Sequence, residues 1–254
     1  METEAASLTA LVRDGTLDAE LAALVWLAFD AGIPVVVAGE PAPVCTTVRD
    51  AVAALVDGRR AVVRLAGETE TFAWMPEAAE LGWQASGRGA GAAAPAWRGA
   101  VMVVDLAPDA AVPTWGEHAR LAIRALTAGY GMAATASGER LEDVLGRLSA
   151  APVGAIDDEL TRLGIVLILG ADAGGAVRVR AAHYLRPVAR DVHGHIQRLA
   201  PAALATWSEQ HGRFDHFAWG VTDEMAGRAG MRPLAFEREQ AARAGRLASA
   251  SRAP

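Results

Sequence analysis

The segment from Ile33 to Leu55 constrains the fold of this chain more than any other part of the sequence. It opens with an uncharged apolar run, IPVVVA at residues 33–38, in which β-branched residues predominate. Such a run is typical of a strand that is buried on both faces of a sheet. A turn is expected from Gly39 to Cys45, and residues 46–55 carry apolar side chains at helical spacing. The segment therefore predicts a strand, a short turn and a helix.

This layout is that of a phosphate-binding loop, in which the start of the helix offers free N–H groups to an anion. The usual motif is glycine, four residues, and then Gly-Lys-Ser/Thr. Gly39 fills the first place and Thr46 the last, but Val44 replaces the second glycine and Cys45 replaces the lysine. Two prolines inside the expected turn also lack a backbone N–H. The pattern predicts that the frame persists while its phosphate chemistry is lost.

Composition narrows the classes of function that fit the chain. Its 254 residues are 52% hydrophobic and 21% charged, which suits one sizeable globular α/β domain with a small appendage. The formal net charge of −6 argues against a general nucleic-acid-binding surface. All 24 basic residues are arginine, so no other lysine of the chain can replace the missing one. An arginine could do so only in part, because its planar fork is not a compact ammonium.

Cysteine usage and apolar patterning predict the compartment. The one cysteine, Cys45, rules out an intrachain disulfide and fits a reducing environment. The N-terminus is acidic and lacks a signal pattern, and no apolar run approaches the roughly 20 residues needed to span a bilayer. We therefore expect a cytoplasmic protein without direct membrane insertion.

Strand and helix patterns alternate along the rest of the chain and predict a mainly parallel sheet flanked by helices. Further strands are expected at residues 61–66, 100–105, 132–135 and 165–169, with helices at 8–11, 17–29, 117–128 and 141–150. Residues 177–185 alternate well enough for an edge strand, joined to the preceding strand by a hairpin turn at 173–175. The Gly- and Ala-rich region from Trp83 to Trp97 is interpreted as a flexible loop. Asp105 ends the clearest strand, where a Walker B strand delivers a carboxylate beside Mg²⁺.

In this order the motifs resemble the ATPase domain of the type II/type IV secretion and pilus-assembly ATPases, a class of P-loop NTPases. The resemblance covers roughly residues 11–190, from the LVRDGTL segment through the loop unit and the strand that ends at Asp105. It is strongest at residues 121–131, LAIRALTAGYG, which is similar to the family's Ala-Leu-Thr-Gly-His-Gly stretch. Residues 135–148 resemble its histidine box and following helix, and residues 177–187 its closing hairpin.

The resemblance implies a RecA-like P-loop NTPase fold over residues 1–190, with a C-terminal hairpin. After it we expect a small helical appendage at residues 191–236, packed by tryptophan and phenylalanine side chains. The last segment, 237–254, consists mostly of Ala, Arg and Ser and is expected to be a frayed helix or disordered.

The residues that carry activity in that family are replaced in this chain. The resemblance places the loop lysine at Cys45, the Walker B glutamate at Asp105, the arginine that follows it at Ala107 and the histidine of the histidine box at Ser137. Joint replacement of several catalytic elements indicates a chain that keeps the fold without the hydrolysis. We expect Cys45→Lys alone to restore little ATP affinity, and its combination with Val44→Gly to restore measurable binding without hydrolysis.

The site candidates are few. The candidates for catalysis are Glu68, Glu70 and Asp105, of which the first two match the family's acidic box only loosely. The candidate nucleotide contacts of the degenerate loop are Gly39, Val44, Cys45, Thr46 and Thr47. Thr46 and Asp105 are metal ligands only if a Mg-nucleotide binds. Each also has an ordinary structural interpretation. Hydroxyls at a helix start are common caps, and Cys45 is more simply a small apolar residue than a reactive thiol.

The favoured function is that of a pseudo-ATPase, a non-hydrolysing structural or regulatory component of a secretion or pilus assembly. The resemblance implies other secretion or pilus components as partners, including an active ATPase paralogue, in a ring-like homo- or hetero-oligomer at the inner face of the membrane. One alternative is an active but divergent NTPase that hydrolyses Mg-ATP, with Arg49 in place of the lysine. Another is an enzyme with Cys45 as nucleophile and His183 as base, although nothing in their spacing brings them together.

Two histidine clusters complete the candidates. His193 and His195 form a His-x-His step that could bind a metal, but the sequence places no third ligand, so a solvated turn is favoured. The same interpretation applies to His211, Asp215 and His216.

Overall fold

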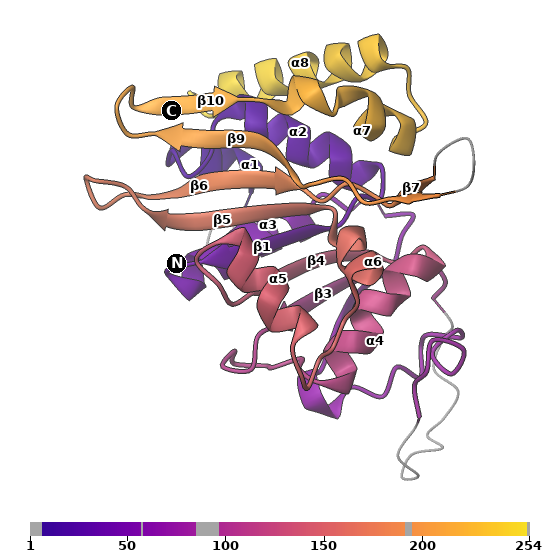
Figure 1. Cartoon of the computed structure of the whole chain (residues 1–254). Helices are drawn as coiled ribbons and strands as arrows, with labels where there is room; N and C mark the ends of the chain where they lie inside the picture. Colours follow the sequence, from indigo (N-terminus) through magenta and orange to yellow (C-terminus); the bar gives the residue numbers. More distant parts are fainter. Residues whose placement is uncertain (1–6, 57, 85–96, 191–194, 253–254) are drawn as a thin grey trace.

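The structure is a computed structural model that describes residues 7–56, 58–84, 97–190 and 195–252 (Figure 1). Its main feature is a mixed sheet in the order β10-β9-β6-β5-β1-β4-β3-β2. The strands are β1 (Val35–Gly39), β2 (Val62–Arg64), β3 (Val101–Leu106), β4 (Gly131–Ala136), β5 (Ile165–Ala171), β6 (Val177–Tyr184), β9 (Ala202–Ser208) and β10 (Arg213–His216). The five strands from β5 to β2 are parallel, whereas β6, β9 and β10 are antiparallel. Two short strands, β7 (Ala189–Arg190) and β8 (Ile196–Gln197), pair separately.

Helices cover both faces of this sheet (Figure 1). One face is covered by α1 (Leu8–Arg13), α2 (Ala19–Asp30), α3 (Ala42–Ala53), α7 (Thr222–Arg228) and α8 (Pro233–Ala250). The other is covered by α4 (Glu117–Ala125), α5 (Leu141–Ser149) and α6 (Asp157–Leu160). Single 3₁₀ turns lie at η1 (Gly67–Thr69), η2 (Leu126–Ala128), η3 (Thr161–Leu163) and η4 (Ala218–Gly220).

Strand β1 lies inside the sheet, with β5 on one side and β4 on the other. Its side chains alternate between two hydrophobic cores: Val35 and Val37 belong to the core on the α3 face, while Val36 and Ala38 belong to the core on the α5 face. All four are at most 1% exposed. The prediction of a strand buried on both faces is therefore confirmed, and it explains why this segment carries no charge.

The five expected strands are all present in one sheet, and β5 and β6 form the expected antiparallel hairpin. The α/β class is confirmed, but the sheet is more antiparallel than expected because β9 and β10 continue it beyond β6. The N-terminal helices also form, and Asp18 caps α2 by accepting a hydrogen bond from the Leu21 N–H at 2.9 Å. Most of the expected loop at 83–97 lies outside the described residues.

The segment at residues 191–236 differs from the expected helical appendage. Within residues 191–236, β9 and β10 join the main sheet and bury Leu204, Ala205 and Phe214 in the core on the α3 face. Sequence reasoning missed these strands because β10 has only four residues and β9, AALATWS, is rich in alanine, a weak strand former.

The tail, expected to be a frayed helix or disordered, is helical: it forms most of α8, an 18-residue helix that packs against α2. Phe236 and Leu247 are buried in the core, and Arg243 pairs with Asp30 at 2.5 Å. The same Arg243 lies 4.6 Å above the ring of Trp26. Ala and Arg are strong helix formers, so two buried apolar residues and these arginine contacts are enough to hold the helix.

Among the helices of the described residues, none combines the length and the apolar character that crossing a bilayer requires.

Candidate functional site

A cleft of about 1160 Å³ opens at the carboxyl ends of β1, β3 and β4. The chain leaves β1 into α3 on one face of the sheet and leaves β4 into α5 on the other, so the two helices diverge around the cleft. Open parallel sheets bind their ligands at such a reversal of direction. Of the predicted site residues, the cleft is lined by Gly39, Cys45, Thr46 and Asp105, but not by Val44, Thr47, Glu68 or Glu70.

The cleft is acidic. Its lining holds six carboxylates, from Glu40, Asp105, Asp109, Glu139, Glu142 and Asp143, and three guanidinium groups, from Arg49, Arg140 and Arg147. Its formal charge is therefore −3 at neutral pH. A cleft of this sign repels nucleotide phosphates and favours cations.

Helix α3 begins at Ala42, so only Glu40 and Pro41 separate it from β1. The expected turn from Gly39 to Cys45 is therefore wrong, because most of it is the first turn of the helix. The prolines provide the physical reason: Pro41 is the extended N-cap and Pro43 lies in the first turn, where the absent N–H would have no partner within the helix. The two prolines, which were interpreted from the sequence as unfavourable for a phosphate-binding loop, instead allow the helix to begin early.

Every N–H in this first turn is already used. The Ala42 N–H donates to the carboxylate of Glu40 at 3.1 Å, and those of Val44 and Cys45 donate to the Pro41 carbonyl at 3.0 and 3.3 Å. Pro43 has no N–H to offer. The carboxylate of Glu40 thus takes the place that a bound anion takes at a helix N-terminus. Residues 42–45 leave no donor for a phosphate.

Gly39 is required by the packing of the sheet. Its φ is +108°, and a Cβ at this position would lie 2.0 Å from the carbonyl oxygen of Leu169 on β5. Only glycine avoids that collision. The glycine that matches the first place of the motif is therefore explained by the neighbouring strand without any ligand.

Cys45 is 3% exposed and belongs to the core on the α3 face. Its Sγ lies 3.4 Å from the carbonyl oxygen of Gly39. Burial, helped by the negative charge of Glu40, raises the pKa of this thiol to about 11, so it is protonated at neutral pH. The interpretation of Cys45 as a small apolar residue is confirmed.

The structure keeps Cys45 and His183 apart. His183 on β6 is paired in register with Val166, whose side chain lies in the core on the α5 face. Cys45 lies in the core on the opposite face of the sheet. Burial also lowers the pKa of His183. The hypothesis of a Cys–His pair is therefore wrong.

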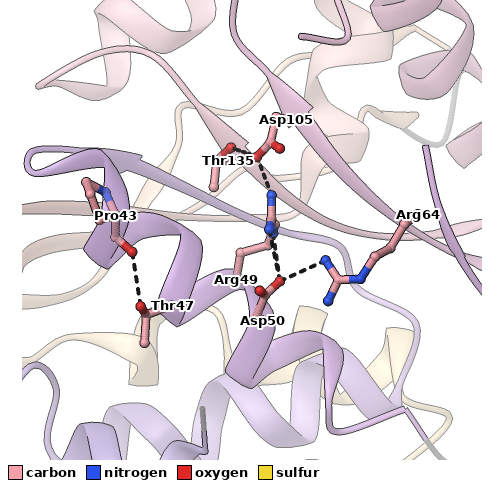
Figure 2. Close-up of polar contacts among 7 residues, drawn as sticks. All are labelled: Pro43, Thr47, Arg49, Asp50, Arg64, Asp105 and Thr135. Carbon is pink, nitrogen blue, oxygen red and sulfur yellow. Dashed lines mark hydrogen bonds and ion pairs between the residues drawn. The ribbon is translucent and has the colours of Figure 1, made fainter. Parts of the chain in front are cut away.

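Arg49, on α3, lines the cleft and points toward Asp105 and Thr135 (Figure 2). It is only 5% exposed, and its Nη1 donates a hydrogen bond to Oδ1 of Asp105. Its Nε also donates to Asp50 at 3.0 Å. The Thr135 hydroxyl, from the end of β4, donates to the same Asp105 oxygen.

The ion pairs continue toward the surface, where Nη1 of Arg64 lies 3.2 Å from the Asp50 carboxylate. Sequence reasoning considered Arg49 only as a substitute for lysine and missed this pairing. The sequence did contain one signal that Arg49 faces the cleft: it lies four residues after Cys45, and residues with that spacing share one side of a helix.

The carboxylate of Asp105 therefore lies where the Walker B comparison placed it, at the end of β3 and beside the cleft. Its negative charge is balanced by a guanidinium from the same chain. Arg49 therefore already supplies Asp105 with the positive charge that a bound Mg²⁺-nucleotide would otherwise bring. Among the residues that the structure describes, no group of three His, Cys, Asp or Glu side chains is arranged to hold a metal ion.

Glu70 has a structural role. It is 9% exposed and accepts hydrogen bonds from the N–H groups of Ala66 and Phe72 at 3.1 and 2.8 Å, and from the Trp74 indole at 3.3 Å. These bonds fix the turn that holds Phe72 at a φ of +53°. Glu68 is exposed on η1, outside the cleft.

Thr47, Ser137 and His216 each have a hydrogen-bond partner within the chain. Thr47 is exposed and donates to the Pro43 carbonyl at 3.0 Å, and Ser137 donates to Asp109 at 3.0 Å. Ala107 is buried. His216 pairs with Asp18 at 2.8 Å.

The other histidines do not form a site with His216. His211 contacts the Ser208 hydroxyl at 2.9 Å, and Asp215 pairs with Arg213 at 3.6 Å. The His193–His195 step lies partly outside the described residues.

Comparison with known proteins adds no assignment: no protein-family model matches the chain, and no curated protein is significantly similar to it.

Proposed function

We propose that this chain is a degenerate secretion-type P-loop NTPase homologue that does not hydrolyse ATP and serves as a structural or regulatory component of a secretion or pilus assembly. The motif order over residues 11–190 motivates the family. A RecA-like fold is supported by five parallel strands, by the β1–α3 unit and by a carboxylate at the end of a separate strand of the same sheet.

The observation that carries the loss of hydrolysis is the ion pair between Arg49 and Asp105. Phosphoryl transfer is catalysed mainly by positioning and by charge stabilisation, which need a lysine, free backbone donors and a metal-binding carboxylate. In this cleft a buried thiol stands at the lysine position, Glu40 and Pro41 accept the backbone N–H bonds, and Arg49 neutralises the carboxylate. The lysine and the free backbone donors are therefore missing, and the carboxylate that is present is already paired with Arg49.

The alternative is an active but divergent NTPase in which Arg49 replaces the lysine. It is favoured by one observation, the presence of the Arg49 guanidinium in the cleft beside Asp105. In that case Arg49 has to exchange Asp105 for a phosphate, and Asp105 has to take up Mg²⁺.

Calorimetry with Mg-ATP and Mg-ADP separates the two functions. We expect no saturable heat of binding at millimolar nucleotide and no release of inorganic phosphate. Saturable binding by the unmodified protein would contradict the proposal. If that binding disappears in Arg49→Gln but persists in Arg64→Gln, the divergent NTPase is the better description, because Arg64 belongs to the same ion-pair network but is 61% exposed.

The assembly role has its own test. We propose that the protein works in the cytoplasm, at the inner face of the membrane through its partners, within a ring or partial ring. Cross-linking in the native host followed by mass spectrometry should recover a secretion or pilus component, such as an active ATPase paralogue. Light scattering that shows only monomer at high protein concentration would contradict self-assembly into a ring.

A further inference from the structure

A second groove, of about 540 Å³, lies away from the cleft described above. It is formed by η4, the start of α7, α8 and the N-terminal end of α2. Helix α8 contributes Ala241 and Ala244, whose small side chains leave room, and also Glu237. Glu20 enters from α2. None of these residues lines the first cleft.

Trp219, which lines this groove, is 80% exposed. It is the most exposed of the large hydrophobic side chains in the described part of the chain. Phe217, two residues earlier, is 40% exposed but does not line the groove. Exposed aromatic residues at a groove are a mark of interaction surfaces, and tryptophan is among the residues that contribute most to binding at interfaces.

The charges around Trp219 select the kind of ligand. Glu237 makes no ion pair or hydrogen bond with another described residue, so its carboxylate is available. Glu20 lies 3.7 Å from Nδ1 of His216, whose other nitrogen already pairs with Asp18. No arginine lines the groove. An indole face beside carboxylates complements a flat cation.

We propose that this groove binds an arginine-bearing segment of a partner protein. A guanidinium stacks on an indole face and pairs with a carboxylate through two parallel N–H bonds, which a compact ammonium does less well. A separate partner is favoured over a second copy, because copies that each carry a net charge of −6 repel one another. This inference is independent of the proposed function, since it concerns another surface.

Nuclear magnetic resonance can follow Trp219 directly. In ¹⁵N-labelled protein, the indole N–H signal that is missing from the Trp219→Phe spectrum belongs to Trp219. Titration with the peptide Ac-Ala-Arg-Ala-Ala-Arg-Ala-NH₂ should shift this signal saturably. The same peptide with citrulline in place of arginine keeps the shape and loses the charge, and it should bind at least about tenfold more weakly.

Matched variants localise the effect. Trp219→Ala should abolish the calorimetric signal, and Glu237→Gln should weaken binding by about tenfold, the size of one charge-assisted contact. Trp97→Ala and Glu68→Gln change exposed residues outside the groove and should leave binding unchanged.

Three results would overturn the proposal. They are equal binding of the citrulline peptide, an equal effect of Trp97→Ala and Trp219→Ala, and a concentration-dependent dimer that Trp219→Ala abolishes without any peptide. The last result would assign the groove to self-association. None of them bears on nucleotide binding, which is measured separately with Mg-ATP.

Discussion

The guanidinium of Arg49, on α3, is hydrogen-bonded to the carboxylate of Asp105 at the end of β3, and the Thr135 hydroxyl donates to the same oxygen. The side chain of Arg49 is 6% exposed and that of Asp105 is 22% exposed, so the pair is largely shielded from water. A carboxylate at this place in a parallel sheet is otherwise suited to a metal ion. Here it instead ties α3 to β3 and β4.

Removal of Arg49 should destabilise the fold strongly. Arg49→Met leaves the carboxylates of Asp105 and Asp50 without their buried partner, and we expect a loss of about 3 kcal/mol in the free energy of unfolding. Arg64→Met is the matched control in the same network. Its side chain is 61% exposed, so the loss should stay below about 1 kcal/mol. Urea denaturation measures both, and equal losses would show that Arg49 is not structurally important.

Cys45→Lys should damage the fold instead of restoring a phosphate site. From the sequence we expected this change alone to restore little ATP affinity, and the structure adds that residue 45 is 3% exposed and packed in the core. Burying an ammonium there should lower stability by about 3 kcal/mol or more. Thr47→Lys, exposed on the same helix, is the control and should change stability little.

The double variant Val44→Gly/Cys45→Lys should also fail to bind ATP, because Glu40 and Pro41 still accept the N–H bonds of the first turn. This replaces the expectation of measurable binding drawn from the motif alone. Calorimetry on a variant that circular dichroism shows to be folded decides the point, and saturable ATP binding would restore the phosphate-loop interpretation.

Gly39→Ala should be destabilising without any ligand present. The new Cβ would collide with the Leu169 carbonyl, and a φ of +108° is unfavourable for alanine, so we expect a loss above about 2 kcal/mol. Gly245→Ala is the control, and it should change stability in the opposite direction. It lies within α8, a Cβ there meets nothing within 4 Å, and it should gain up to about 1 kcal/mol of stability. Thermal unfolding of both variants tests this, and a neutral Gly39→Ala would refute the packing explanation.

The His216–Asp18 pair should make stability depend on pH. The hydrogen bond that Nε2 of His216 donates to the Asp18 carboxylate raises the pKa of His216 above its usual 6.5, assisted by the charges of Asp18, Glu20 and Asp215 and opposed by burial. A raised pKa in the folded state means that the stabilisation is fully present below pH 6.5. It is then lost as the pH rises through the folded-state pKa.

The measurement is the difference in unfolding free energy between the unmodified protein and His216→Gln, taken from pH 5.5 to 9. This difference should be largest at the acidic end and should shrink as the pH rises. Subtraction removes the contribution of His183, whose lowered pKa gives the opposite trend. A constant difference would show that the pair carries no net charge interaction.

Local pattern was sufficient to predict much of the architecture. The uncharged, β-branched run at residues 33–38 predicted a strand buried on both faces, and alternating strand and helix patterns predicted the α/β class. The glycine-rich turn near residue 174 was recognised as that of a hairpin. These features depend on neighbours in the sequence, so periodicity and turn chemistry are enough to reveal them.

The site depended on contacts between distant residues, which only the tertiary structure decided. Arg49 meets Asp105 across 56 positions of sequence, and Gly39 meets Leu169 only because β1 and β5 are neighbours. The early start of α3, which the motif alignment concealed, lets Glu40 and Pro41 accept the N–H bonds of its first turn. The residue types at the motif positions show which chemical groups the site contains. Whether a carboxylate is already neutralised, and whether a backbone N–H is free to bind a ligand, is decided by the residues that the fold places beside them.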